Sequence, residues 1–467
     1  MRKKRIRWAV FFIFVSAALP AVLFISAFLL PPQFDGTYLG ALKQKKERLE
    51  QTEGKKLIVV GGSSVAFGIR SDLMEEELGM SVVNWGLYAP LGSRTMLEAC
   101  FGKIGEGDIV VFSPEQTPET LSFAFQAKEV WQAFEENYGS IFRAFDEEGM
   151  KKLQGAFPEF SISKLKYALY GKPEVSGIYC RDSFNKYGDI EPGLRPGNSM
   201  PEGYDPTQMI DLSFFPEEKF VEYLNEYARR VKKKGAVFFY RFCPMNESAI
   251  IDENLLDSWY LRLEQEADFA ILGNPHQCVM ESGWFFDTNF HLNDAGAVVN
   301  TYWFVRDIKA QIRDSSPTDI MLPAMPEIRM QESQGESTDA ECFIYEEEGE
   351  GMVITGVTEE GAAREQLTFP AEYNGRKVIA VREGSLAQCR ELKQVNVQMG
   401  IILYDGCFDG CIALRKIMLL ARPSEIIVGR NLLRGTDAML YTEYADDYRL
   451  DYSWGLYSDR IREETGD

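Results

Sequence analysis

A serine, an aspartate and a histidine in this chain have the types and the order that ester chemistry requires. Ser63 and Ser64 follow an apolar β-forming run and two glycines in LIVVGGSSVAFGI, and Asp287 and His291 lie close together in WFFDTNFHLNDAG. A serine hydroxyl becomes a useful nucleophile when a base takes its proton, and histidine is the usual base near neutral pH. A carboxylate near the histidine fixes the ring tautomer and stabilises the imidazolium.

The other candidate chemistries fit the sequence less well. The chain has only two histidines, and His276 in GNPHQC has no acidic residue beside it in sequence. The glycines at 61, 62 and 68 do not have the spacing of a dinucleotide-binding motif or of a P-loop. No segment offers three metal ligands, so neither a cofactor nor a metal is expected. Taken singly, Gly-Gly-Ser-Ser is also typical of a tight turn, and Asp287 could cap a turn. The order of the three residues is what favours a catalytic site.

Alternating strands and helices between residues 56 and 314 are the elements that would position this site. Short apolar runs predict strands, and amphipathic spacing predicts helices between them. Such alternation is typical of an α/β domain with a mostly parallel sheet and helices on both faces. Aromatic-rich residues 116–215 interrupt the pattern and predict a helical insertion that covers the strand ends. The expected strands are 57–60, 82–84, 108–112 and 236–242, and the expected helices are 71–78, 94–103, 216–234, 257–267 and 294–313.

Residues 56 to 313 resemble the SGNH (GDSL-like) hydrolases. The resemblance rests on Gly-Gly-Ser-Ser after the first strand, Asn84-Trp85-Gly86 after the second and the Asp287/His291 pair near the end. It is strongest to membrane-anchored, extracytoplasmic esterases and O-acyltransferases, and it implies a flavodoxin-like fold. It also implies that Ser63 rather than Ser64 is the nucleophile, with His291 as base and Asp287 orienting it. The backbone N–H groups of Ser63 and Gly86 would then bind the oxyanion.

The chain departs from the family pattern at two places. The family's third block carries an asparagine that binds the oxyanion, but here the strand 108–112 is followed by Ser113-Pro114-Glu115-Gln116. The missing donor would come from Gln116 or from an insertion residue such as Asn185. The family's Asp-x-x-His is also one residue longer here, which a bulge can accommodate. Ser64, Asn84 and Glu115 are further candidates for contact with substrate or oxyanion.

The N-terminus predicts a membrane anchor. Five of the first seven residues are basic, and the 23 residues from Trp8 to Leu30 carry no charge. About 20 apolar residues cross a bilayer, and lysine and arginine remain on the cytoplasmic side. We therefore expect a cytoplasmic tail over 1–7, a transmembrane signal anchor over 8–30 and a polar stalk over 31–55. The bulk of the protein would lie outside the membrane of a bacterial cell.

The C-terminal third contains an internal repeat. Residues 315–340 are rich in Pro, Ser and acidic residues and predict a linker. GSLAQCRELKQVNV from Gly384 and GCFDGCIALRKIML from Gly406 then superpose at an offset of 22 residues. This module resembles the leucine-rich repeats of bacterial surface proteins, which implies a short β solenoid over 341–441. Residues 442–467 are expected to form an acidic tail. The eight cysteines form no C-x-x-C motif and are expected to be mostly buried thiols.

The net charge and the expected position outside the membrane limit the classes of function that the sequence suggests. The net charge is -21, which opposes binding to nucleic acid. We expect a cell-surface serine esterase or O-acyltransferase whose substrate is an acylated polysaccharide of the cell envelope. Hydrolysis and transfer share the same three residues, so the sequence leaves both open. The alternative is a non-catalytic adhesion or assembly protein, in which the α/β domain is a scaffold and the repeats bind a protein partner.

Overall fold

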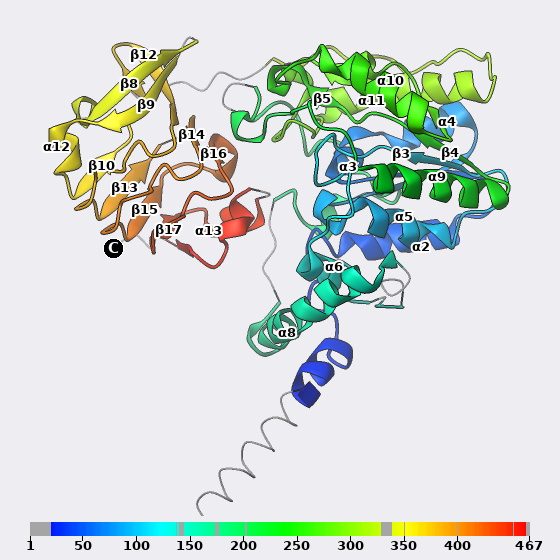
Figure 1. Cartoon of the computed structure of the whole chain (residues 1–467), viewed down its shortest axis with the longest axis horizontal. Coiled ribbons are helices and arrows are strands. Elements are labelled where there is room, and N and C mark those ends of the chain that lie inside the picture. Colours follow the sequence, from blue (N-terminus) through cyan, green and yellow to red (C-terminus); the bar gives the residue numbers. More distant parts are fainter. Residues whose placement is uncertain are drawn as a thin grey trace, which may run out of the picture.

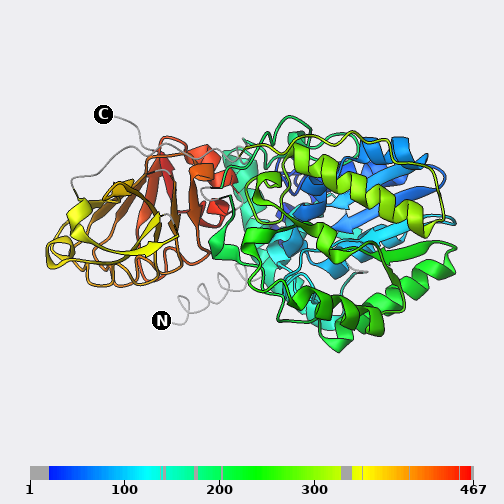
Figure 2. The same cartoon turned by 90° about the horizontal axis from the view of Figure 1, so that it is seen from above.

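An α/β unit and a strand-rich C-terminal unit lie side by side in the computed structural model (Figures 1 and 2). The N-terminal segment leaves the α/β unit beside the helices of the insertion (Figure 1). The structure describes residues 20–136, 138–139, 144–172, 177–200, 203–327, 339–349, 351–398, 400–451 and 453–463.

A five-stranded parallel sheet forms the centre of the α/β unit, in the order β2-β1-β3-β4-β6. β1 and β3 are runs of β-branched residues that are buried along their whole length, as expected for strands covered on both faces. The bounds are β1 Lys56–Gly61, β2 Ser81–Gly86, β3 Ile109–Phe112, β4 Val237–Tyr240 and β6 Ala270–Ile271. The short strands β5 Met245–Asn246 and β7 Val279–Met280 pair separately.

Helices cover both faces of this sheet. Alternate residues of β1 point to opposite faces, so Leu57 and Val59 belong to one hydrophobic core, and Ile58 and Val60 belong to another. The first core includes residues of α4 and α11, and the second includes residues of α2, α5, α9 and α10. The predicted mixed α/β architecture is thereby confirmed. The bounds are α2 Ala41–Gln51, α3 Ser63–Gly68, α4 Ser71–Leu78, α5 Ser93–Phe101, α9 Glu218–Lys233, α10 Leu255–Glu266 and α11 Asp294–Gln311.

The insertion contributes helices α6 (Ala127–Ala133) and α8 (Glu147–Tyr170), which pack against each other beside the N-terminal segment (Figure 1). Of the insertion that was predicted to cover the strand ends, the described helices α6 and α8 pack instead beside the N-terminal segment (Figure 1).

Residues 31–55 are not the stalk that their polarity suggested. Phe34 and Tyr38 are buried in the core of the α/β unit, and α2 buries Leu42 and Leu49 against it. Lys45 is also buried, and its ammonium donates to the carbonyl of Asn84 at 3.2 Å. The buried side chains recur at three- and four-residue spacing, so one face of this charged helix is part of the core.

The predicted anchor over residues 8–30 falls largely outside the described residues, because the description begins at residue 20. Residues 20–28 are helical. Among the residues that the structure describes, no helix is both long enough and apolar enough to cross a membrane.

Parallel strands stack at the repeat period in the C-terminal unit (Figure 2). β13 pairs with β15 so that Gln394 faces Lys416 and Val395 faces Ile417, an offset of 22 residues that equals the sequence repeat. One sheet has the order β10-β13-β15-β17-β18 and the other β16-β14-β12-β9-β8. β8 is antiparallel to β9, and β11 pairs antiparallel with β12 beside this second path. The bounds are β8 Phe343–Glu348, β9 Gly351–Val357, α12 Glu359–Ala362, β10 Gln366–Thr368, β11 Glu372–Tyr373, β12 Arg376–Val381, β13 Gln394–Val397, β14 Ile401–Leu403, β15 Lys416–Leu419, β16 Ile426–Val428 and β17 Met439–Thr442.

Residues 442–463 complete this unit instead of forming a tail. They fold into α13 (Ala445–Leu450) and β18 (Ile461–Glu463), and the side chains of Tyr448 and Trp454 are fully buried. These aromatic side chains stabilise a folded segment despite its acidic composition, because each one buries a large apolar area. All eight cysteines lie within the described residues; they are free thiols, and seven of them are buried.

Candidate functional site

A cavity of about 230 Å³ lies between the two units and contains both Ser63 and His291 in its wall. The segments that follow β1, β2 and β3 all reach it, so it opens at the carboxyl edge of the parallel sheet, where α/β folds usually bind ligands. The lining residues are Ser63, Tyr88, Ala89, Pro90, Glu115, Thr117, Glu119, Thr120, Ala124, Phe125, Gln126, Gln208, Thr288, Phe290, His291, Val428, Arg430, Ser453 and Leu456.

The glycine turn presents Ser63 to this cavity. β1 ends at Gly61, and α3 begins at Ser63. A Cβ at Gly61 would lie 2.5 Å from the carbonyl oxygen of Ser113, and a Cβ at Gly62 would lie 2.4 Å from a carboxylate oxygen of Glu115. The backbone of Ser113 therefore requires glycine at position 61, whereas a side chain at position 62 would have to displace the Glu115 carboxylate. Ser64 is fully buried and does not line the cavity, so Ser63 is the serine that a ligand can meet.

Asp287 and His291 form the contact expected from their order. Asp287 Oδ1 lies 2.8 Å from His291 Nδ1. The backbone N–H of His291 donates to Thr288 Oγ1 at 3.1 Å, and this turn accommodates the extra residue between the pair. The ring of His291 stacks on Phe67 with centroids 4.0 Å apart and planes 7° apart. The imidazole is thus held by a carboxylate on one edge and by an aromatic ring on one face.

Tyr179, from the insertion, is a third member of this group that no sequence motif indicated. Its hydroxyl donates to Asp287 Oδ2 at 2.5 Å and lies 3.2 Å from His291 Nδ1. Burial, together with the nearby Asp287 carboxylate, holds the pKa of Tyr179 well above its usual value. Tyr179 therefore remains a proton donor and fixes the second oxygen of Asp287.

The two predicted oxyanion and substrate residues on β2 are engaged elsewhere. The backbone N–H of Gly86 donates to Asn84 Oδ1 at 3.0 Å. The Asn84 amide donates in turn to the carbonyl of Val65 and to Asp189. Neither residue lines the cavity. Asn84 is a buried structural side chain, and Gly86 could serve an oxyanion only if its present bond opened.

Gln116 and Asn185 do not line the cavity either. The Gln116 amide nitrogen donates to the carbonyl of Pro114 at 3.2 Å and to the hydroxyl of Tyr240 at 2.8 Å. Asn185 Oδ1 accepts from two backbone N–H groups of its own turn. In this arrangement neither side chain replaces the oxyanion donor that the third block lacks.

Glu115 lies in the cavity wall beside Ser63. Its Oε1 accepts from the N–H of Ser64 at 2.9 Å, and its buried Oε2 has no hydrogen-bond partner among the described residues. A carboxylate at this position opposes the development of negative charge on a nearby oxyanion. Glu115 therefore faces the cavity, and its carboxylate is not a donor for an oxyanion.

The C-terminal unit supplies part of the cavity wall, including the cation Arg430. Asp451, which precedes the wall residue Ser453, has its pKa raised to about 7 by removal from water and by the negative charge of Asp287. These residues lie in segments predicted to belong to a separate repeat module and to a tail, so no local pattern connected them to the serine.

His276 does have acidic partners, contrary to its sequence context. Its ring nitrogens lie 2.9 Å from Asp257 and 3.2 Å from Glu253 on the protein surface. The hydrogen bond with Asp257 raises the pKa of His276. His276 does not line the cavity and so is not the base of this site.

Comparison with known proteins does not assign this chain to a family. The sequence matches no model of a known protein family, and a search of curated proteins finds no relative. Within the described residues, no cluster of three or more His, Cys, Asp or Glu side chains could hold a metal ion.

Proposed function

We propose that this protein is a membrane-anchored, extracytoplasmic serine esterase or O-acyltransferase of the SGNH type. The observation that carries the proposal is that Ser63 and His291, which are far apart in sequence, line one cavity. Asp287 contacts Nδ1 of the same histidine. A serine nucleophile needs a base near its hydroxyl and a group that orients the base. A shared cavity and the Asp287–His291 contact support this assignment.

The proposed reaction has two steps. His291 Nε2 takes the proton of Ser63 as its Oγ attacks the ester carbonyl, and the imidazolium then gives that proton to the departing alcohol. This leaves an acyl-serine and free alcohol. Water or a sugar hydroxyl next attacks the acyl-serine, with His291 again taking and returning the proton, and the products are a carboxylic acid or a new ester. Asp287 and Tyr179 hold the imidazole through both steps.

The wall of the cavity favours a carbohydrate ester as the substrate. Aromatic rings of Tyr88, Phe125 and Phe290 lie among hydroxyl and amide side chains, a mixture that suits a polyhydroxylated ligand. The same wall also carries the charged side chains of Glu115, Glu119 and Arg430. The basic N-terminus followed by a charge-free run supports a location on the outer side of a membrane. Acylated glycans of the cell envelope combine both features. The C-terminal unit, which resembles leucine-rich repeats in sequence, would close the glycan-binding side of the cavity.

Hydrolysis of a fluorogenic acetyl ester by the full chain tests the proposal. The full chain is needed because Arg430 and Leu456 of the C-terminal unit belong to the cavity. We expect Ser63→Ala and His291→Ala to abolish turnover and Ser64→Ala to retain it. Equal turnover by all three variants and the unsubstituted protein would refute the proposal.

One set of observations favours a second candidate, a non-catalytic surface protein. The N–H of Gly86 and the amide of Gln116 are engaged in other hydrogen bonds, and the Glu115 carboxylate lies beside the serine. Loss of one oxyanion donor typically lowers turnover by about 10²–10³-fold. If the unsubstituted chain shows no turnover, the cavity becomes a glycan-binding or assembly site, and binding of acylated glycan without cleavage would support that role.

A further inference from the structure

Exposed apolar side chains gather where the N-terminal segment meets the insertion. On the C-terminal half of α8, Ile162, Leu169 and Tyr170 have 56%, 68% and 84% of their surface in solvent. In the N-terminal segment, Phe24 and Leu29 have 56% and 70% exposed. We call these five residues the α8 patch. Exposed apolar side chains on two packed neighbouring segments are a feature of surfaces that bind a membrane or another protein.

The two parts of the α8 patch are held together by direct packing. The ring of Phe28 stacks on Phe157 of α8 with centroids 5.6 Å apart. The carbonyl oxygen of Ala27 accepts from Tyr138 at 2.8 Å and from Lys164 of α8 at 3.0 Å. Figure 1 shows α8 beside the N-terminal segment, on the side of the α/β unit from which that segment leaves.

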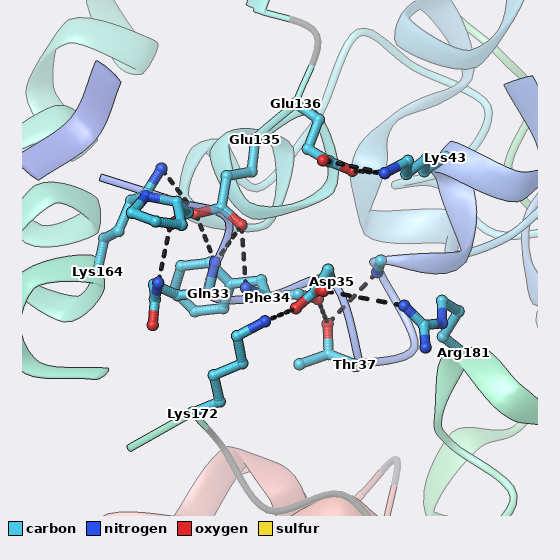
Figure 3. Close-up of polar contacts among 12 residues, drawn as sticks. Gln33, Phe34, Asp35, Thr37, Lys43, Glu135, Glu136, Lys164, Lys172 and Arg181 are labelled. Carbon is cyan, nitrogen blue, oxygen red and sulfur yellow. Dashed lines mark hydrogen bonds and ion pairs between the residues drawn. The ribbon is translucent and has the colours of Figure 1, made fainter. Parts of the chain in front are cut away.

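A buried ion pair fixes the direction of the N-terminal segment (Figure 3). The Glu135 carboxylate accepts from the backbone N–H groups of Gln33 and Phe34 at 2.8 to 3.0 Å, and it pairs with Lys164 at 2.9 Å. The side chains of Glu135 and Lys164 are only 4% and 2% exposed. Breaking a buried pair leaves an uncompensated charge, so the segment is firmly held between α6 and α8.

We propose that the α8 patch inserts into the surface of a lipid bilayer, so that the protein contacts the membrane through α8 as well as through its N-terminus. The chain before the patch is a charge-free run preceded by basic residues, which is the composition that enters a bilayer. Tyr170 and the exposed Lys166 at the same end of α8 suit the headgroup region, where tyrosine and lysine are enriched. This inference rests on the proposed N-terminal anchor and not on the esterase activity, so failure of the chain to enter a bilayer would refute the anchor, whereas entry without contact at α8 would refute this inference alone.

Quenching of a fluorophore by spin-labelled lipid tests the proposal. The full chain, with Cys180→Ser to remove its partly exposed thiol, is placed in nanodiscs of phosphatidylcholine and phosphatidylglycerol that contain doxyl lipid. A thiol-reactive fluorophore is attached at Leu169→Cys or, as a matched control, at Ile412→Cys. Ile412 is 67% exposed and lies in the C-terminal unit, so the two sites differ in place and not in accessibility.

We expect at least a twofold loss of fluorescence at Leu169→Cys and less than 10% loss at Ile412→Cys. Equal quenching at both sites, or none at Leu169→Cys, would overturn the proposal. A chain that does not enter nanodiscs would overturn it as well. A dimer that shields the fluorophore without lipid quenching would assign the α8 patch to a second copy of the chain instead.

Discussion

Replacing Tyr179 with phenylalanine should separate the positioning of Asp287 from the chemistry of Ser63. The change removes a hydroxyl that donates to Asp287 Oδ2 and leaves the ring in place, where it packs at 5.5 Å from Tyr38. A hydrogen bond to a charged group contributes about 1.5–3 kcal/mol. Since about 1.4 kcal/mol corresponds to tenfold in rate, we expect kcat to fall by about 10- to 100-fold.

If Tyr179 only positions Asp287, the variant should change kcat and leave KM nearly unchanged. Tyr179 does not line the cavity, so KM should remain within about twofold while kcat falls. Asp287→Asn should lower kcat further, by about 10⁴-fold, because the asparagine side chain also stabilises the wrong tautomer of His291. The measurement is steady-state hydrolysis of an acetyl ester by the full chain.

Tyr227→Phe is the matched control. Tyr227 is a fully buried tyrosine on α9 whose hydroxyl donates to the carbonyl of Leu97 at 2.8 Å, away from the cavity. Its loss should lower thermal stability without changing kcat. A kcat for Tyr179→Phe within twofold of the unsubstituted protein would refute the assigned role. So would an equal loss of kcat in Tyr227→Phe, because general destabilisation would then explain both.

Three further outcomes follow from charged groups near the cavity and the N-terminal segment. Glu115→Gln keeps an acceptor for the Ser64 N–H but removes the negative charge, so kcat for ester hydrolysis should rise, by up to about 10²-fold; a fall would contradict this. Asp451 has a folded pKa of about 7 against 3.8, so its contribution to the free energy of unfolding is present below pH 4 and is lost as pH rises to about 7. Asp451→Asn should flatten that slope in thermal melts from pH 4 to 8, and an unchanged slope would count against it. Lys164→Met leaves Glu135 buried without its ion-pair partner and should lower the free energy of unfolding by about 3–5 kcal/mol in urea melts; a loss below 1 kcal/mol would show that the pair is not structural.

The central sheet could be predicted because its signals are local. The apolar run from Leu57 to Val60 is long enough for a strand that is covered on both faces, and the amphipathic spacing of Ser71–Leu78 coincides with α4. Ser63 follows the first predicted strand and His291 precedes the last predicted helix, and both side chains line the cavity. Patterns of this kind depend on neighbours in sequence and not on distant packing.

The remaining features depend on contacts between distant segments. Tyr179 donates a hydrogen bond to Asp287 although 108 positions separate them, and no spacing rule connects the two. Leu42 and Leu49 lie in a helix whose mean composition is polar, so their burial depends on the surface that α2 meets. Trp454 is buried within a segment whose acidity suggested a tail. For these helix and C-terminal residues, tertiary packing determines burial, and the average composition of the segment does not predict it.

Covalent labelling of the full chain with a fluorophosphonate probe tests the central claim most directly. The phosphorus should form a bond to Ser63 Oγ as fluoride leaves, and peptide mass spectrometry should find the adduct on Ser63 and not on Ser64. The adduct should be lost in Ser63→Ala and strongly reduced in His291→Ala. Absence of labelling at Ser63 in a correctly folded chain, or labelling that is unaffected by His291→Ala, would contradict the account.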